Sequence, residues 1–280
     1  QPASMDLRLG RRVWRVRASF LPGPNRRVED RLHDVALHEI DLTHGAVLET
    51  GAVYIAELLE SLDLGPDLLA SANPKSSTGR LDVFTRVITD HATLFDQIAP
   101  AYRGPLFLEI SPRTFPVLVR TGTALAQIRL RTGTARLTDA ETADLQRLEK
   151  LVAGADVSIQ SGISVGVDLT GFGSQQLVGY RAKRHTGLVD MDRIGHYAVA
   201  DFWEPIPARS DGELILDPGQ FYILASKEAV CVPPDYAAEM TPFDPLVGEF
   251  RVHYAGFFDP GFGHASAGAH NTRAVLEVRS

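Results

Sequence analysis

Two stretches of this sequence, LETGAVYI at residues 48–55 and LDPGQFYI at residues 216–223, share Leu, Gly, Tyr and Ile at matching positions. The turn glycines of the two copies, Gly51 and Gly219, are 219 − 51 = 168 residues apart. In each copy the glycine ends a turn, and the β-branched and aromatic residues after it are typical of a strand. A long repeat of this kind predicts two copies of one β-rich unit.

Two further echoes occur in the same order along the chain. SMDL at residues 4–7 matches GVDL at residues 166–169, and GPLFLEI at residues 104–110 matches AVLEV at residues 274–278. The third echo aligns Glu109 with Glu277, again 277 − 109 = 168 residues apart. The first copy continues through GTALAQI at residues 122–128, whereas the second stops soon after Glu277. We therefore expect the second copy to be truncated at its C-terminal strands.

Strand-like runs dominate the rest of the chain and are separated by Gly and Pro. They are residues 12–20, 53–59, 106–110, 116–120, 124–131, 220–225 and 274–278. The one clear helix candidate is residues 139–152, which follow Thr138 as an N-cap. These patterns predict a mainly β protein with a first β-rich repeat at residues 1–135, a helical linker at 136–154 and a second repeat at 155–280.

Composition excludes several classes of protein. Hydrophobic residues make up 44% and charged residues 22% of the 280 residues, which excludes intrinsic disorder. No apolar run reaches the roughly 18 residues of a membrane span. The net charge of −7 argues against nucleic-acid binding. A single cysteine, Cys231, excludes an intramolecular disulfide, and with no signal-peptide pattern the expected location is the cytoplasm. The chain does not begin with Met, so we expect it to start inside a longer protein.

The segment KSSTGR at residues 75–80 combines hydroxyls, a glycine and two cations. Such a loop can surround phosphate oxygens, although an ordinary polar turn has the same composition. The segment AGFFDPGFG at residues 255–263 places Asp-Pro-Gly between aromatic arms and predicts a β-hairpin. Its backbone groups and Phe rings suit a flat heterocycle, or serve structure alone.

Glu109 and Glu277 each alternate with large apolar neighbours, so each carboxylate faces away from those neighbours. If that face is solvent, the carboxylate is inert; if it lines a cleft, it can act as a general acid or base. The nine histidines show no zinc-binding spacing, and the His-x-Glu and Pro-Cys-x-x-Cys signature of zinc nucleobase deaminases is missing.

Together these motifs resemble the dCTP deaminase and dUTPase superfamily, and the two-copy arrangement resembles the long fused bacterial dCTP deaminases. QPASMDLRLG at residues 1–10 resembles the entry motif, PKSSTGRL at 74–81 the phosphate-side loop, and AGFFDPGF at 255–262 the base-reading hairpin. The resemblance implies two dUTPase-like distorted jelly-roll barrels joined by a helical linker. It also implies hydrolytic deamination of dCTP to dUTP and ammonia by a trimeric or pseudo-trimeric homo-oligomer.

Each half lacks one motif of the family pattern, and the motif that it lacks is present in the other half. The first copy lacks Asp-Pro-Gly at residues 90–104, and the second lacks Ser-Ser and Arg at residues 242–249. Because sites of this superfamily are assembled across neighbouring units, the pattern predicts composite sites that combine the first loop with the second hairpin. The alternatives are a dUTPase, a bifunctional dCTP deaminase and dUTP diphosphatase, or a decayed nucleotide-binding scaffold.

The resemblance also implies roles for single residues. Glu277 is the preferred general base, Glu109 is the second choice, and the backbone of Ala255 helps to position water. Mg²⁺ arrives with the substrate triphosphate, and no zinc is needed. The residues expected to contact substrate are Lys75, Ser76, Ser77, Arg80, Gly256, Phe257, Asp259 and Phe262.

Overall fold

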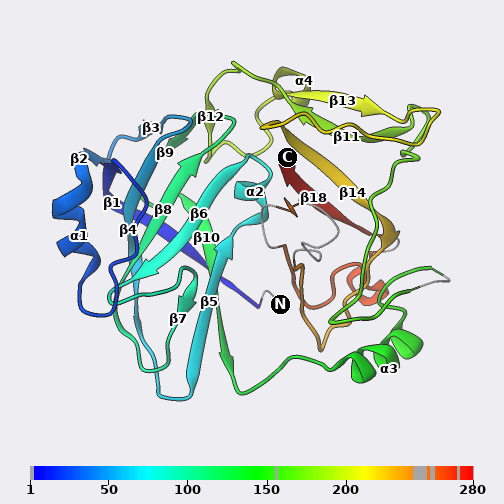
Figure 1. Ribbon diagram of the computed structural model, residues 1–280, viewed down its shortest axis with the longest axis horizontal. Coiled ribbons are helices and arrows are strands. Elements are labelled where there is room, and N and C mark those ends of the chain that lie inside the picture. Colours follow the sequence, from blue (N-terminus) through cyan, green and yellow to red (C-terminus); the bar gives the residue numbers. More distant parts are fainter. Residues whose placement is uncertain (1–2, 155–156, 242–250, 253–255, 270–271, 280) are drawn as a thin grey trace. The chain divides into compact units, whose positions relative to one another are not determined.

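The computed structural model describes all of the chain except residues 1–2, 155–156, 242–250, 253–255, 270–271 and 280 (Figure 1). The chain forms two compact units. The N-terminal unit comprises Ser4–Gly133 with Arg184–Phe202, and the C-terminal unit comprises Gln1–Ala3, Thr134–Lys183 and Trp203–Ser280. Each unit is described by itself below.

Most of the N-terminal unit is one eight-stranded sheet with the order β6-β8-β4-β1-β10-β5-β7, in which β2 also pairs with β1. The sheet curls into a nearly closed barrel. Its strands are β1 (Met5–Val16), β2 (Ala36–Asp41), β4 (Val53–Asp63), β5 (Leu68–Pro74), β6 (Val83–Thr89), β7 (Gln97–Ile98), β8 (Arg103–Pro112) and β10 (Ala124–Thr132). A second small sheet contains β3 (Ala46–Leu48), β9 (Val117–Val119) and β12 (Val189–Asp190).

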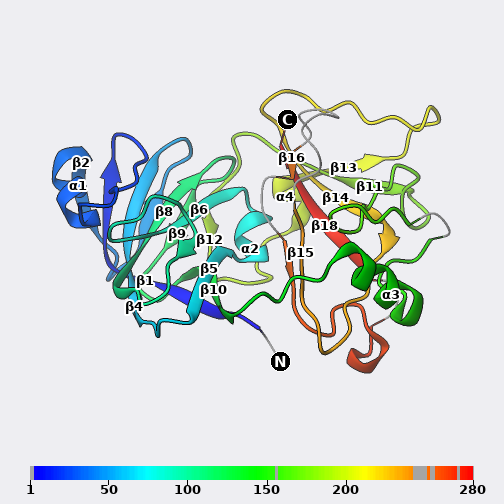
Figure 2. The same cartoon turned by 60° about the horizontal axis from the view of Figure 1, so that its bottom comes forward.

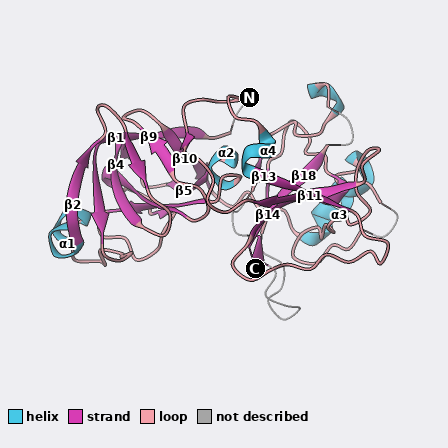
Figure 3. Ribbon diagram, turned by 90° about the horizontal axis from the view of Figure 1, so that it is seen from above, coloured by secondary structure: helices cyan, strands magenta, loops and turns pink. Residues whose placement is uncertain are grey.

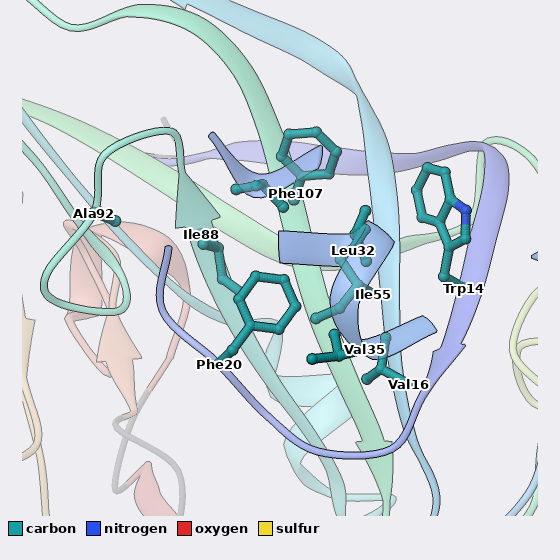
Figure 4. Packing of buried hydrophobic residues seen from close by; sticks show 10 residues of the cluster. Trp14, Val16, Phe20, Leu32, Val35, Ile55, Ile88, Ala92 and Phe107 are labelled. Atoms are coloured by element: carbon teal, nitrogen blue, oxygen red, sulfur yellow. The ribbon is translucent and has the colours of Figure 1, made fainter. Parts of the chain in front are cut away.

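Alternation along β8 divides the core of the N-terminal unit into two sides. Leu106, Leu108 and Ile110 are fully buried on one face, whereas Phe107 and Glu109 point to the other. Helix α1 (Val28–Val35) covers that second face, and Figure 4 shows its Leu32 beside Phe107. The helix and sheet share one hydrophobic cluster, formed by Trp14, Val16, Phe20, Val28, Leu32, Val35, Ile55, Ile88, Ala92 and Phe107.

The segment Arg184–Phe202 follows the middle of the chain yet belongs to the N-terminal unit. Its strand β12 adds parallel to β9, and its short helix α4 (Val199–Phe202) ends at Phe202. The Phe202 ring meets that of Phe115 edge-on at 5.6 Å. The guanidinium of Arg120 donates to both carboxylate oxygens of Asp190, at 2.7 and 2.9 Å. A bidentate pair of this kind fixes the segment in orientation as well as position.

The C-terminal unit contains a five-stranded sheet with the order β13-β11-β14-β18-β16 and helix α3 (Asp139–Glu149) (Figure 2). The sheet strands are β11 (Leu177–Ala182), β13 (Trp203–Pro207), β14 (Phe221–Ala229), β16 (Arg251–Val252) and β18 (Arg273–Arg279). Two short strands, β15 (Ala238–Glu239) and β17 (Phe257–Phe258), form a separate ladder, and a 3₁₀ helix spans Ala265–Ala267.

The main sheets of the two units have the same strand order and register. In the N-terminal unit β2-β1-β4-β8-β6 are successive neighbours, as β13-β11-β14-β18-β16 are in the C-terminal unit. Ile55 pairs with Glu109, and Ile223 pairs with Glu277. In both units a tyrosine hydroxyl accepts a hydrogen bond from the backbone of the preceding turn. Tyr54 accepts from Glu49 N at 3.0 Å, and Tyr222 accepts from Asp217 N at 2.8 Å.

The local expectations from the sequence agree with the secondary structure, in which strands outnumber helices (Figure 3). Each of the seven strand-like runs overlaps a strand. Thr138 caps α3 by accepting from Glu141 N at 3.3 Å, so the predicted N-cap is confirmed. The helix ends at Glu149, earlier than predicted, because Lys150 adopts a left-handed conformation with φ 52°. No helix within the described parts of the chain has the length and apolarity needed to cross a membrane.

Candidate functional site

The loop at residues 75–80 is a single helical turn, α2 (Ser76–Gly79), between β5 and β6. Lys75 O accepts from Thr78 N and Gly79 N at 2.9 and 3.0 Å, and Thr78 and Gly79 are buried. The side chains of Ser76, Ser77 and Arg80 are exposed, and within the described residues nothing hydrogen-bonds or ion-pairs with them. The exposed residues of the turn thus present two hydroxyls and a guanidinium that are available to an anionic ligand.

Lys75 differs from the other predicted ligands of this loop. Its ammonium donates to the carboxylate of Asp6 on β1, and the side chain is only 29% exposed. Its backbone N–H donates to Leu125 O at 3.0 Å and so continues the β5–β10 ladder. The cation is therefore already paired within its own unit.

Glu109 is buried, with 2% of its surface exposed, so the solvent-facing alternative for this carboxylate is wrong. Arg86 lies opposite it on β6 and donates to Glu109 Oε1 through Nε at 3.0 Å and Nη2 at 2.6 Å. The guanidinium also stacks over the Phe95 ring at 3.6 Å and donates to Ser19 Oγ at 2.9 Å. The carboxylate of the first copy is thus neutralised within its own unit, although Glu109 Oε2 has no hydrogen-bond partner among the described residues.

Asp96 is a second carboxyl near this ion pair, in the loop that replaces Asp-Pro-Gly in the first copy. Its Oδ1 accepts from Val87 N at 2.7 Å, and its backbone is left-handed with φ 60°. Burial raises the pKa of Asp96 to about 7, and the nearby Glu109 adds to the rise, while the Val87 hydrogen bond and Arg86 oppose it.

We expect Asp96→Asn to make the protein more stable at pH 8 than the wild type, by on the order of 2–4 kcal/mol. The folded-state pKa lies above the ordinary value, so the stability that Asp96 contributes is full at acid pH and is lost as pH rises through about 7. Asn cannot ionise, tolerates positive φ and retains the acceptor for Val87 N. Thermal unfolding at pH 5 and pH 8, with the exposed Asp63→Asn as control, measures the effect. If the stability difference between Asp96→Asn and the wild type is the same at pH 5 and pH 8, the prediction is wrong.

Glu277 is also buried, at 5% exposure, so its carboxylate does not lie on a solvent face either. Its strand neighbours Leu276 and Val278 pack into the core of the C-terminal unit with Tyr222 and Leu224. Alternation places Glu277 on the opposite face of β18 from that core. Ile223, its partner on β14, is only half-buried, whereas the equivalent Ile55 in the N-terminal unit is fully buried.

The Asp-Pro-Gly sequence forms the predicted turn: Phe262 N donates to Asp259 O at 3.1 Å, and Gly261 has φ 88°. Pro before a positive-φ Gly is the signature of a type II turn. The predicted pairing of the two arms as a simple hairpin is wrong. Phe257–Phe258 pairs with Ala238–Glu239, and Phe262 O accepts from Val232 N at 2.7 Å. Each arm therefore hydrogen-bonds to a segment some 20–30 residues earlier in the chain.

The remaining predicted residues of this segment lie around the turn. The Phe258 and Phe262 rings are 4.7 Å apart, and Asp259 Oδ1 accepts from Ala3 N at 2.9 Å. Gly256 O accepts from Met240 N at 2.7 Å. Ala255, predicted to position water, lies outside the described residues, as do residues 242–249, where the second copy lacks the Ser-Ser loop.

Sequence reasoning missed Arg86, Asp96 and Asp6. Each acts through a partner more than ten residues away or on another strand, so no local spacing indicates it. No group of three His, Cys, Asp or Glu side chains suited to holding a metal ion occurs within the described portion of the chain.

Two family models match the chain. The N-terminal domain model of 2′-deoxycytidine 5′-triphosphate deaminase matches residues 1–134, and the C-terminal domain model of the same enzyme matches residues 138–280.

Curated relatives match the first half. A dCTP deaminase of Halorubrum lacusprofundi is 33% identical over 131 residues, which are 46% of this chain and 61% of the relative. A dUMP-forming dCTP deaminase of Salinispora arenicola is 30% identical over 131 residues, or 46% of this chain and 64% of the relative. The chain thus spans less than two thirds of the length of these relatives.

The crystal structure of a 2′-deoxycytidine 5′-triphosphate deaminase from Agrobacterium tumefaciens superposes on the whole chain. The TM-score is 0.95 at 64% sequence identity, with 100% of this chain and 84% of that chain covered.

Proposed function

The chain belongs to the 2′-deoxycytidine 5′-triphosphate deaminase family, and from this we propose that it converts dCTP and water to dUTP and ammonia. The observation that carries the proposal is the match of the full chain, at 64% identity and a TM-score of 0.95, to the Agrobacterium tumefaciens deaminase. The exposed hydroxyls and guanidinium of the α2 loop and the buried carboxylate of Glu277 supply the chemistry that the reaction needs.

In the proposed reaction Glu277 is the general base. Its carboxylate takes a proton from water as the water oxygen bonds to C4 of cytosine, and the proton then passes to the amine as the C4–N bond breaks. Glu109 has the same strand register, but its carboxylate is held by Arg86 on a face covered by α1. We therefore assign the chemistry to Glu277 and a structural role to Glu109.

Ser76, Ser77 and Arg80 are the proposed substrate ligands of the N-terminal unit, because their polar groups are exposed and unengaged by described residues. In the C-terminal unit Gly256, Phe257, Asp259 and Phe262 are the proposed base-reading residues, and Ala255 the proposed water-positioning residue. That the loop and this segment serve the same composite sites stays a prediction from the sequence.

We also infer that the two halves are tandem copies of one dUTPase-like barrel, joined by a linker that contains α3. The shared strand order and the matching pairs Ile55–Glu109 and Ile223–Glu277 support this inference. The proposed protein is a cytoplasmic homo-oligomer, with no nucleic-acid or membrane partner. Its substrate is the Mg²⁺ complex of dCTP, in which the ion neutralises triphosphate oxygens, and no zinc takes part.

A second candidate function has specific support, since some of the curated relatives are dUMP-forming dCTP deaminases. Incubation with dCTP and Mg²⁺, with ammonia, pyrophosphate and nucleotides measured, separates the two. We expect ammonia and dUTP in equal amounts without pyrophosphate. Ammonia with dUMP and pyrophosphate would show the bifunctional reaction, and nucleotide binding without ammonia would show a decayed site.

We expect Arg80→Ala to raise the KM for dCTP by about tenfold or more, with a smaller change in kcat. A guanidinium that binds phosphate contributes charge-assisted hydrogen bonds to ground and transition states alike, and removal of such uniform binding appears in KM. Steady-state ammonia release measures both constants, with Arg11→Ala, an exposed arginine paired with Asp41 on the same unit, as control. An unchanged KM for Arg80→Ala would contradict the assignment.

A further inference from the structure

The Asp6–Lys75 ion pair joins two strands that are not neighbours. Asp6 lies on β1 opposite Gln127 of β10, and Lys75 follows the last residue of β5, which pairs with β10 from its other side. The lysine side chain therefore crosses over β10, a span of two strand spacings or about 10 Å. Only an extended lysine or arginine is long enough for such a contact.

The contact lies where the exposed turn leaves the sheet. The Lys75 N–H is the last rung of the β5–β10 ladder, and Lys75 O accepts the N–H groups of Thr78 and Gly79 that close the turn. Lys75 thus connects the sheet to the residues that display Ser76, Ser77 and Arg80. An anchor on its side chain restricts the orientation of the whole turn.

The surrounding side chains on the same sheet face are tied in a similar way. Arg129 Nη1 donates to Asn73 Oδ1 at 2.8 Å, and Ser4 Oγ donates to Gln127 Oε1 at 2.9 Å. Asn73 is buried, at 5% exposure. At the base of the loop, polar side chains therefore link β5 to β10 and link β10 to the residue that precedes β1.

We propose that Asp6 is a positioning residue of the substrate-binding loop: it holds Lys75, and Lys75 orients Ser76, Ser77 and Arg80 rather than binding phosphate itself. This inference rests on the proposed function, and it gives Lys75 a role different from that of a substrate ligand, which the sequence predicts. The opposite arrangement, in which Lys75 leaves Asp6 to bind the triphosphate, gives the opposite sign in the experiment below.

The test is Asp6→Asn in the full-length protein, assayed by steady-state release of ammonia from dCTP. If Asp6 positions the loop, the KM for dCTP rises about two- to fivefold, the range of a partly exposed ion pair, while kcat changes less than KM. Lys75→Met raises KM by a similar factor, and the double variant is no worse than either single one. The exchanged pair Asp6→Lys with Lys75→Asp recovers part of the loss.

If Lys75 instead binds phosphate, Asp6→Asn frees its ammonium, and the KM falls or stays the same while Lys75→Met is far more damaging. That result would overturn the proposal. Glu60→Gln is the matched control, because it breaks a different β1 ion pair, Arg8–Glu60 at 2.7 Å, and leaves the loop intact. We expect its KM to equal that of the wild type. We also expect the difference in KM between Asp6→Asn and the wild type to become smaller in high salt, because salt screens exposed charges.

A measurement without substrate separates this inference from the proposed function. Hydrogen–deuterium exchange of peptides that cover residues 68–82 reports the amides of Thr78, Gly79 and Arg80, whose hydrogen bonds close the turn. We expect faster exchange in Asp6→Asn than in the wild type or in Glu60→Gln. Unchanged exchange would refute the positioning role even in an active enzyme, whereas absence of ammonia release by the wild type would refute only the proposed function.

Discussion

Glu277→Gln is expected to lower kcat for dCTP deamination by about 10²- to 10⁴-fold while leaving nucleotide binding nearly unchanged. Gln has the shape of Glu and still offers an acceptor oxygen, but it cannot take a proton from water. Ammonia release gives kcat, and equilibrium binding of dCTP gives the affinity separately. The buried position of Glu277 on β18 makes a neutral replacement easy to accommodate, so we expect the variant to fold.

The matched control is Glu109→Gln, which makes the same chemical change at the same strand register in the other unit. We expect it to retain most of the wild-type kcat, because Glu109 is already bound to Arg86 beneath α1. Loss of activity in Glu109→Gln with activity kept in Glu277→Gln would move the chemistry to the N-terminal unit. Equal losses would mean that neither residue is the sole general base.

Arg86→Met is expected to lower the free energy of unfolding by about 3–5 kcal/mol, the usual cost of removing one partner of a buried ion pair. Glu109 is 2% exposed, and in the part of the chain that the structure describes its Oε2 already lacks a hydrogen-bond partner. Without Arg86, its Oε1 loses both donors, and the carboxylate is left charged in an apolar setting or must take up a proton. Denaturant unfolding monitored by tryptophan fluorescence measures the change.

The double variant Arg86→Met with Glu109→Gln tests the cause of that loss. A neutral amide removes the uncompensated charge, so we expect the double variant to recover a large part of the stability lost in Arg86→Met. If the double variant is as unstable as Arg86→Met alone, the loss comes from packing of the guanidinium against Phe95 rather than from the charge. Neither variant changes Glu277. We therefore expect Arg86→Met to reduce stability more than Glu277→Gln does, and Glu277→Gln to reduce kcat more than Arg86→Met does.

The sequence by itself determined the local structure of this protein. Alternation of apolar residues indicates the strands that contain Glu109 and Glu277, because the two-residue period of a strand is written directly in the chain. Thr138 and Glu141 mark the start of α3 in the same local way. Asp-Pro-Gly specifies a turn at Asp259–Phe262 because Pro fixes a negative φ and Gly permits a positive φ at the two central positions. The motifs also indicated the deaminase family before any contact was known.

Only the tertiary structure decided which of these residues meet. Arg86 and Glu109 are 23 residues apart, Asp6 and Lys75 are 69 apart, and Arg120 and Asp190 are 70 apart. No periodicity along the chain relates such residues, since their contact depends on which strands become neighbours and in which register. Such contacts also decide what a side chain is free to do: Lys75, which the sequence predicts as a phosphate ligand, is paired with Asp6 across β10. The carboxylate of Glu109 on β8 is likewise determined by its neighbours, because Arg86 donates to it beneath α1.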